Sequence, residues 1–317
     1  MGHDRPIRLE AGGALRYAGT NAGAHILWTD LFRRLEILQP RLFAPDIGLL
    51  GEASPDWMAA LGPSGHVWGH LRGLGWRSGR QIVLPLHERH IGATPDRCWA
   101  LVPDAAALAT LANKRAFARF AARHGLGRHI PRTLDLKAPS FPAVLKRLNL
   151  NAGTGIAVVT SQAELDDHLS RAPWLGQPVM LQRLIASRTE YVTHVVCAEG
   201  RIVWHCTYAY DLKGPRVIRG GRISQQPSPR HVSTGTAALD VFEQFLRPLG
   251  FNGPANIDYR HRRDGSIAIL EINPRFGGSL MRPENADDLA AAVRTIVRHA
   301  RWRPASVAVV PSVAPAV

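Results

Sequence analysis

Three oxygen-bearing side chains are predicted to meet at the open end of a β-hairpin near residue 270. Asp258 lies on the first predicted strand, and Glu271 and Asn273 lie at the end of the second, Ile267–Ile272. Asp264–Gly265 between them is a favoured two-residue hairpin turn, so the two strands end side by side. Carboxylate and amide oxygens suit Mg²⁺, which completes its octahedron with phosphate and water. A surface hairpin with ordinary polar residues is the alternative interpretation.

Arg275 follows this hairpin directly, and Gly277–Gly278 come next. Glycines allow a backbone to approach an anion closely, and the guanidinium supplies positive charge. The stretch Ala255–Ser279 is therefore where the chemistry of this chain is expected to converge.

Lysine is scarce in this chain. Of 39 Lys and Arg residues only four are lysines, namely Lys114, Lys137, Lys146 and Lys213. A compact ammonium and a planar guanidinium are not interchangeable, so the retained lysines point to places where a point charge is needed. Lys137 lies beside Ala138–Pro139 and fits an incidental loop residue, whereas the other three need an explanation.

Lys146 ends a predicted buried strand, Ala143–Lys146, and a turn rich in Asn and Gly follows at 149–155. Backbone N–H groups of such a turn can cradle phosphate oxygens while the ammonium neutralises charge. The order does not match a P-loop, and a plain β-turn is the alternative.

Predicted strands and helices are interspersed along the chain, which favours an α/β organisation. The expected strands are 81–86, 98–102, 143–146, 156–159, 179–184, 190–198, 201–210, 256–259 and 267–272, and the expected helices are 25–38, 105–112, 114–124, 162–169, 237–249 and 283–300. Asp104 and Ser161 precede two of these helices and are predicted to cap them. His87-Glu88-Arg89-His90 does not have the H-E-x-x-H spacing of a zinc site.

The segment Gly214–Gly235 is long, basic and without a predicted element, a type of loop that is either functional or disordered. It contains Arg216, Arg219, Arg222 and Arg230. Recognition of an acidic substrate, closure of the site and a disordered basic loop are all open interpretations.

The net charge is +14, yet the basic residues are spread along the chain without an Arg-rich arm interleaved with aromatics. A cleft for small anions such as ATP accounts for this charge better than nucleic-acid binding does. No long apolar run or signal-peptide core is present, and the three cysteines are unpaired in spacing, so we expect a cytoplasmic protein without a membrane span.

The order and spacing of these residues resemble the ATP-grasp superfamily, whose members include D-alanine–D-alanine ligase, glutathione synthetase and biotin carboxylase. The resemblance covers about residues 105–300, and the string Glu271-Ile272-Asn273-Pro274-Arg275 is its most specific part. The separation of Asp258 from Glu271 is similar to that in D-alanine–D-alanine ligase.

The resemblance assigns a role to each candidate residue. Lys114, Lys146 and Lys213 would contact ATP phosphates beneath a flexible turn, Gly153-Thr154-Gly155. Gln182 would accept from the adenine amino group, Arg183-Leu184-Ile185 would form the hinge, and Glu190 would bind the ribose. Asp258, Glu271 and Asn273 would hold Mg²⁺ or Mn²⁺, with two ions expected, and Arg275 would steady the transferred phosphoryl group together with Lys213.

The implied fold is α/β (α+β), with ATP bound between two subdomains. The expected divisions are a divergent N-terminal α/β domain (1–104), a small ATP-grasp subdomain (105–185), a catalytic subdomain (186–302) and a flexible tail (303–317). The implied activity is ligation of a carboxylate to an amine through an acyl phosphate, with release of ADP and phosphate. A phosphotransferase and a non-catalytic ATP-binding module are the alternatives, and a homodimer is left open.

Overall fold

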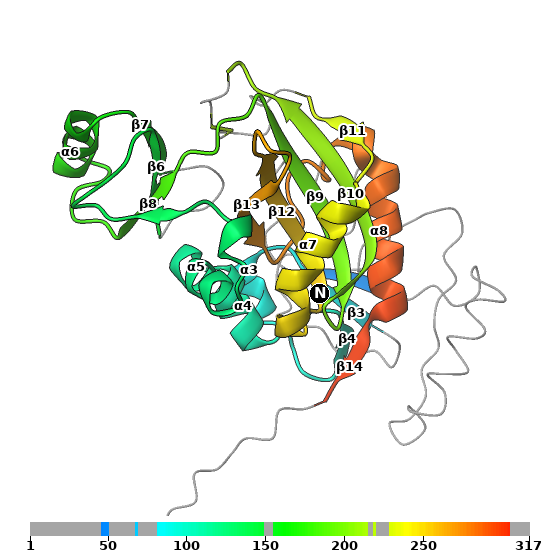
Figure 1. Ribbon diagram of the computed structural model, residues 1–317. Helices are drawn as coiled ribbons and strands as arrows, with labels where there is room; N and C mark the ends of the chain where they lie inside the picture. The colour runs from blue at the N-terminus through cyan, green and yellow to red at the C-terminus, as the bar shows by residue number, and fades with distance from the viewer. Residues whose placement is uncertain are drawn as a thin grey trace, which may run out of the picture.

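The computed structural model describes residues 46–50, 67–68, 81–148, 155–214, 218–219 and 228–304. Within these ranges the chain forms three β-sheets flanked by helices, which confirms the expected mixed α/β class (Figure 1). No described helix is long and apolar enough to cross a membrane.

The sheet that carries most of the candidate residues is antiparallel, with strand order β11-β10-β9-β12-β13. Its strands are β9 (Thr189–Ala198), β10 (Arg201–Asp211), β11 (Arg230–Val232), β12 (Gly253–His261) and β13 (Ile267–Asn273). Both predicted hairpins, β9–β10 and β12–β13, are confirmed. Asp258 pairs directly with Glu271, and a bulge follows between Asp258 and Tyr259.

Two helices cover opposite faces of this sheet, because successive strand residues point to opposite sides. Helix α7 (Thr236–Leu246) contributes Phe242 and Phe245 to a core that includes Ile257 and Tyr259 of β12. Helix α8 (Ala286–His299) packs on the other face, near Tyr208. Asn256, Asp258 and Arg260 alternate with the residues on the α7 face and therefore project away from α7.

A smaller sheet, in the order β5-β8-β6-β7, stands apart from the larger one in Figure 1. Its strands are β5 (Thr133–Leu134), β6 (Ala143–Arg147), β7 (Ile156–Val159) and β8 (Val179–Arg183), and α6 (Gln162–Ser170) packs against it. Ser161 caps α6 by accepting from the backbone N–H of Glu164, as the sequence predicts.

The third sheet contains the N-terminal strands in the order β14-β4-β3-β1-β2. Strands β1 (Asp46–Leu50), β2 (Val67–Trp68), β3 (Gln81–Pro85) and β4 (Cys98–Ala100) are parallel, and the edge strand β14 (Arg301–Arg303) is antiparallel to β4. The short helix α3 (Glu88–Ile91) follows β3. The edge strand is not foreseen from the sequence, which shows only a short Arg-Trp-Arg run there.

Helices α4 (Ala105–Leu111) and α5 (Lys114–Arg123) follow the N-terminal sheet and pack beside α7 through Phe117, Phe120 and Phe245. Asp104 caps α4, as the sequence predicts. Three short 3₁₀ turns are present in the described ranges: η3 (Gly127–His129), η5 (Arg247–Leu249) and η6 (Pro283–Asn285).

The last two predicted helices are shorter than expected because a 3₁₀ turn takes over at one end of each. Helix α7 changes to η5 at Arg247, where Pro248 lacks an N–H for the α-helical ladder. The predicted helix at 25–38 lies outside the described residues.

The β9–β10 turn provides a stability test, because Gly200 has φ +75° and a Cβ there would lie 2.5 Å from the Cα of Arg247. We expect Gly200→Ala to lower the free energy of unfolding by about 1–3 kcal/mol through this backbone clash. The left-handed conformation adds about 1–2 kcal/mol.

Gly265→Ala is the matched control, since Gly265 has φ +78° but no atom within 4 Å of an added Cβ. Urea denaturation of both variants measures the difference. Equal destabilisation would contradict the packing of η5 against the β9–β10 turn.

Candidate functional site

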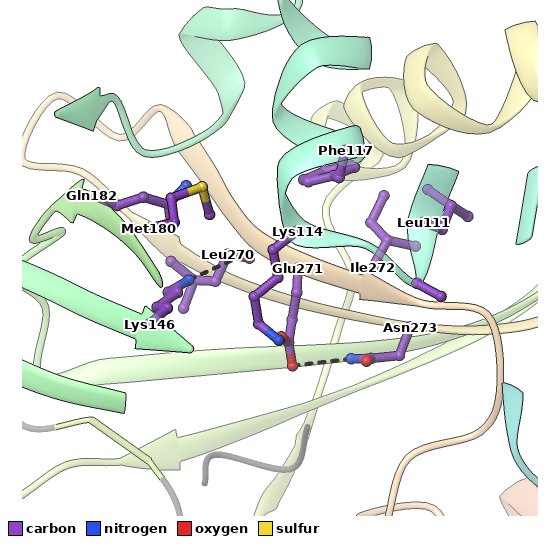
Figure 2. Close-up of a pocket in the computed structure, with 11 residues that line it drawn as sticks. Leu111, Lys114, Phe117, Lys146, Met180, Gln182, Leu270, Glu271, Ile272 and Asn273 are labelled. Carbon is purple, nitrogen blue, oxygen red and sulfur yellow. Dashed lines mark hydrogen bonds between the residues drawn. The ribbon is translucent and has the colours of Figure 1, made fainter. Parts of the chain in front are cut away.

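A cleft lies where α5, the small sheet and β13 meet (Figure 2). It is lined by Leu111, Ala112, Lys114, Phe117, Lys146, Met180, Gln182, Leu270, Glu271, Ile272 and Asn273. The cleft therefore brings together five of the predicted site residues, drawn from four separate elements.

The two lysines of the cleft lie at the start of helix α5 and near the end of strand β6. Asn113 caps α5 by accepting from the backbone N–H groups of Arg115 and Ala116, each at 3.0 Å, which fixes Lys114 in the first helical turn. In Figure 2 the Lys114 side chain points toward Glu271. Lys146 comes from the opposite side, on strand β6, and its Nζ lies 3.5 Å from the carbonyl oxygen of Leu270.

Lys146 is 7% exposed, so its charge is largely removed from water. Burial lowers the pKa of this ammonium, and the Glu271 carboxylate opposes that effect. Burial acts to raise the pKa of Glu271, but Lys146 and the Asn273 amide outweigh it and lower that pKa. The Lys146 amine and the Glu271 carboxyl group therefore each shift the pKa of the other toward the charged form.

Gln182 has a buried carbonyl oxygen, Oε1, with no hydrogen-bond partner within the described structure. Its amide nitrogen lies 3.4 Å from the carbonyl oxygen of Pro131, on the side away from this acceptor. A buried polar atom without a partner is costly, and a ligand N–H can satisfy it. Gln182 therefore brings an acceptor without a partner to the cleft lining, and its contact with an adenine amino group stays a prediction.

Asp258 and Glu271 are directly paired across the β12–β13 ladder, so their carboxyl groups lie close together. Burial raises the pKa of Asp258, and the Glu271 carboxylate raises it further. Asn273 donates to Glu271 Oε1 at 3.1 Å, and Asn256 donates to Asp258 Oδ2 at 3.2 Å. Two amides thus hold a crowded carboxylate pair in place.

Glu190 is buried between two arginines. Arg260 Nη2 lies 2.8 Å from Glu190 Oε2, and Arg219 Nε lies 2.8 Å from Glu190 Oε1. Arg219 also reaches Asp258 Oδ1 with its Nη2 at 2.7 Å. Sheet register explains the first pair, because Tyr259 on β12 lies opposite Tyr191 on β9, which places Arg260 beside Glu190.

The carboxylate pair and Asn273 present oxygen atoms of the kind that Mg²⁺ binds. No group of three or more His, Cys, Asp and Glu residues in the described ranges forms a metal-binding cluster. The candidate metal ligands are instead the two carboxylates Asp258 and Glu271 and the Asn273 amide. The negative charge of this set is what suits it to a metal ion. Asp258 and Glu271 are crowded together, and a cation, Arg219, already hydrogen-bonds to Asp258.

Several predicted residues lie outside the cleft lining. Lys213 is exposed beyond the end of β10, and Arg275 forms an ion pair with Glu88, with Nε 3.0 Å from Oε1. Gly155 accepts from the Arg147 N–H at 2.8 Å, whereas Gly153 and Thr154 fall outside the described residues.

Several backbone groups of the predicted hinge, Arg183-Leu184-Ile185, form hydrogen bonds within the protein. The Arg183 N–H donates to Arg132, the Leu184 N–H donates to Pro142, and the Ile185 carbonyl accepts from Arg260 at 3.0 Å. The hinge is therefore anchored to both the small sheet and β12.

Three residues of the site are missed by the sequence interpretation: Arg260, Asn256 and Glu88. Asn256 and Arg260 alternate with the buried positions of β12, so a two-residue period around Asp258 is the signal that could have found them. Glu88 gives no comparable signal, because its contact with Arg275 spans 187 positions (275 minus 88) and depends on how the N-terminal sheet packs.

No protein-family model matches the chain. The arginine-specific carbamoyl phosphate synthase large chain of Bacillus subtilis is 24% identical to this chain over the matched residues. The match covers 43% of this chain and 13% of the synthase chain. A second match is 26% identical over 44% of the chain and covers 29% of an uncharacterized protein of Sinorhizobium fredii. The chain thus spans less than a third of either relative.

Solved structures provide broader matches. Phosphoribosylamine–glycine ligase of Thermotoga maritima matches with TM-score 0.57 and 15% identity, over 81% of this chain and 76% of that one. D-Alanine–D-alanine ligase of Bacillus anthracis, complexed with ATP, gives TM-score 0.53 and 12% identity over 80% and 95%. L-Amino acid ligase of Bacillus licheniformis gives TM-score 0.50 and 16% identity over 68% and 55%.

These solved structures are ATP-grasp ligases. At 12–16% identity the likeness defines the fold, so the chain has the ATP-grasp fold that the order of its site residues predicts. The chain spans 55% of the L-amino acid ligase and most of the other two.

The Arg260–Glu190 pair provides a test of the buried network, since both side chains are at most 5% exposed. We expect Arg260→Met to lower the free energy of unfolding by about 2–3 kcal/mol, because the buried Glu190 carboxylate loses one of its two charge partners and keeps only Arg219. Chemical denaturation measures the loss.

Arg301→Gln is the control, because its pair with Glu199 is exposed on both sides and should contribute nothing measurable. If the two variants had equal stability, the buried network would not have the importance assigned to it.

Proposed function

We propose that this chain is an ATP- and Mg²⁺-dependent ligase that activates a substrate carboxylate as an acyl phosphate and couples it to an amine. ADP and phosphate are the released products. We place the nucleotide between residues 105–185 and 186–302, in the cleft lined by Lys146 and Glu271.

The observation that carries this proposal is the arrangement of charge across one cleft. Lys114 and Lys146 come from α5 and β6, and they face Glu271 and Asn273 at the end of β13. Ammonium groups neutralise phosphate oxygens, and carboxylate oxygens hold the metal that accompanies a nucleotide. A cleft with two lysines on one wall and a carboxylate and an amide on the other suits a metal–nucleotide complex.

Each end of the nucleotide has a residue of suitable chemistry. The orphan Oε1 of Gln182 would accept from the adenine amino group, and Glu190 would accept from the ribose hydroxyls. Lys114 and Lys146 would contact phosphates, and Asp258, Glu271 and Asn273 would hold Mg²⁺, which supplies charge neutralisation at the γ-phosphate.

The chemistry proceeds in two displacements. A substrate carboxylate oxygen attacks the γ-phosphorus, the bond to the bridging oxygen breaks, and ADP leaves. An amine then attacks the carbonyl carbon of the acyl phosphate, and the C–O bond to phosphate breaks as the nitrogen loses a proton. Positioning and charge stabilisation are the protein's contributions, and Arg275 is proposed to steady the transferred phosphoryl group.

The solved structures support this proposal through what their titles state. All three are ligases, the one from Bacillus anthracis is complexed with ATP, and the names of all three include an amino acid. We therefore infer that an amino acid is the first substrate class to try for this chain, as the acid or as the amine.

The central prediction is that ATP turns over to ADP and phosphate only when a suitable acid and amine are both present. Glu271→Gln should reduce this rate about a hundredfold or more, because loss of a metal ligand removes several kcal/mol of transition-state stabilisation. A phosphate-release screen of amino acids and small acids against amines, with ATP and Mg²⁺, measures both effects.

Glu199→Gln is the control, since Glu199 is an exposed carboxylate of the β9–β10 turn. Formation of AMP and pyrophosphate would refute the acyl-phosphate route. A stable phosphorylated product without phosphate release would instead identify a phosphotransferase, and nucleotide binding without turnover would identify a binding module.

A further inference from the structure

Arg219 is hydrogen-bonded to Asp258, one of the three proposed metal ligands. Its side chain is 17% exposed, and its guanidinium bridges Glu190 Oε1 and Asp258 Oδ1 at 2.8 and 2.7 Å. The guanidinium carbon also lies 4.5 Å from the centre of the Tyr210 ring, so a cation–π contact holds it from a third side.

Both carboxylate oxygens of Asp258 already accept a hydrogen bond. Its Oδ1 accepts from Arg219, and its Oδ2 accepts from Asn256 at 3.2 Å. A divalent cation at Asp258 would need a carboxylate oxygen with a lone pair directed toward the ion. The ion would also lie close to the positive charge of the guanidinium, which would repel it. Arg219 and a metal ion at this carboxylate therefore compete for the same oxygen and the same negative charge.

Building on the proposed function, we propose that the Arg219 guanidinium takes the place of the divalent cation at Asp258 in the ligand-free chain. The metal ion binds at Asp258 only when the guanidinium leaves. In the ligand-free chain Arg219 neutralises Asp258 and braces it against Glu190. Metal binding exchanges the single positive charge of the guanidinium for the double charge of the ion, so Asp258 has a cation partner in both states.

The contacts of Glu190, the other carboxylate that Arg219 binds, explain why Arg219 can be exchanged for a metal ion. Glu190 has a second arginine, Arg260, which binds its other oxygen from within β12 and is 2% exposed. Loss of Arg219 therefore leaves Glu190 with a charge partner. Asp258 has no such second arginine among the described contacts, and a metal ion would replace the charge that it loses.

The chemistry of the Arg219 side chain also suits it to take the place of the divalent cation. An arginine fork can donate to two carboxylates at once, whereas a lysine ammonium is a single point charge. Bridging Glu190 and Asp258 needs the fork, and the structure uses different nitrogens, Nε and Nη2, for the two acceptors.

The direct test is Mn²⁺ binding to the nucleotide-free protein, followed by electron paramagnetic resonance. We expect Arg219→Gln to raise the affinity for Mn²⁺ about tenfold, which corresponds to about 1.4 kcal/mol, because a competing positive charge is removed. Arg219→Lys, which keeps a positive charge, should raise the affinity for Mn²⁺ less.

Arg230→Gln is the matched control, since Arg230 belongs to the same 214–235 segment but pairs with the exposed Asp211. The affinity of this variant for Mn²⁺ should equal that of the wild type.

Thermal unfolding gives a second readout that does not depend on activity. Mg²⁺ should raise the Tm of Arg219→Gln more than that of the wild type, because the metal replaces the missing cation. Equal Mn²⁺ affinity for Arg219→Gln and the wild type, with equal Tm responses, would overturn the proposal.

The wild type itself supplies a test if Arg219→Gln does not fold. Its buried Arg219 Nε–H signal, assigned by its loss in Arg219→Lys, should shift in ¹⁵N NMR when Mg²⁺ and ADP are added. An unchanged signal at saturating ligand would overturn the exchange while leaving the proposed function intact. If Asp258→Asn and the wild type bound Mn²⁺ and ADP equally, the proposed function would fail instead.

Discussion

The charge balance of a buried carboxylate cluster is the constraint on which the rest of this site depends. Asp258 lies beside Glu190 and Glu271, and both of these carboxylates raise the pKa of Asp258. Burying an unpaired carboxylate costs several kcal/mol, so the fold must bring cations to the same place. Lys146 and Arg260 supply charge from β6 and β12. Arg219 supplies it from the segment that follows β10.

This balance links the small sheet to the larger one. Lys146 belongs to β6 of the small sheet, yet it is buried against Leu270 and the charge of Glu271 on β13. The Ile185 carbonyl, just beyond β8, is held by Arg260 from β12. Contacts of this kind fix the width of the cleft, because separating the two sheets would leave Glu271 without the Lys146 charge that faces it.

The sequence predicts local structure well where the signal is local. The β12–β13 hairpin follows from Asp264–Gly265 and two apolar strands, and the caps of α4 and α6 follow from Asp104 and Ser161. The scarcity of lysine directs attention to Lys114 and Lys146, and the structure places both in the cleft.

Pairings that depend on packing between distant segments are not predictable in this way. Arg219 is one of four arginines in a segment without a periodic pattern, and nothing in its neighbours distinguishes it from Arg230. Its contact with Asp258 spans 39 positions, and the contact of Arg275 with Glu88 joins the segment after β13 to helix α3. Such partners become apparent only when the strands are in register.

A crystal structure of the protein with Mg²⁺ and a non-hydrolysable ATP analogue would test the proposed site most directly. We expect a metal ion bound by Asp258 and Glu271, phosphate oxygens beside Lys146, and the Arg219 guanidinium displaced from Asp258. Nucleotide bound away from this cleft, or Arg219 still bridging Glu190 and Asp258 with no metal present, would contradict it.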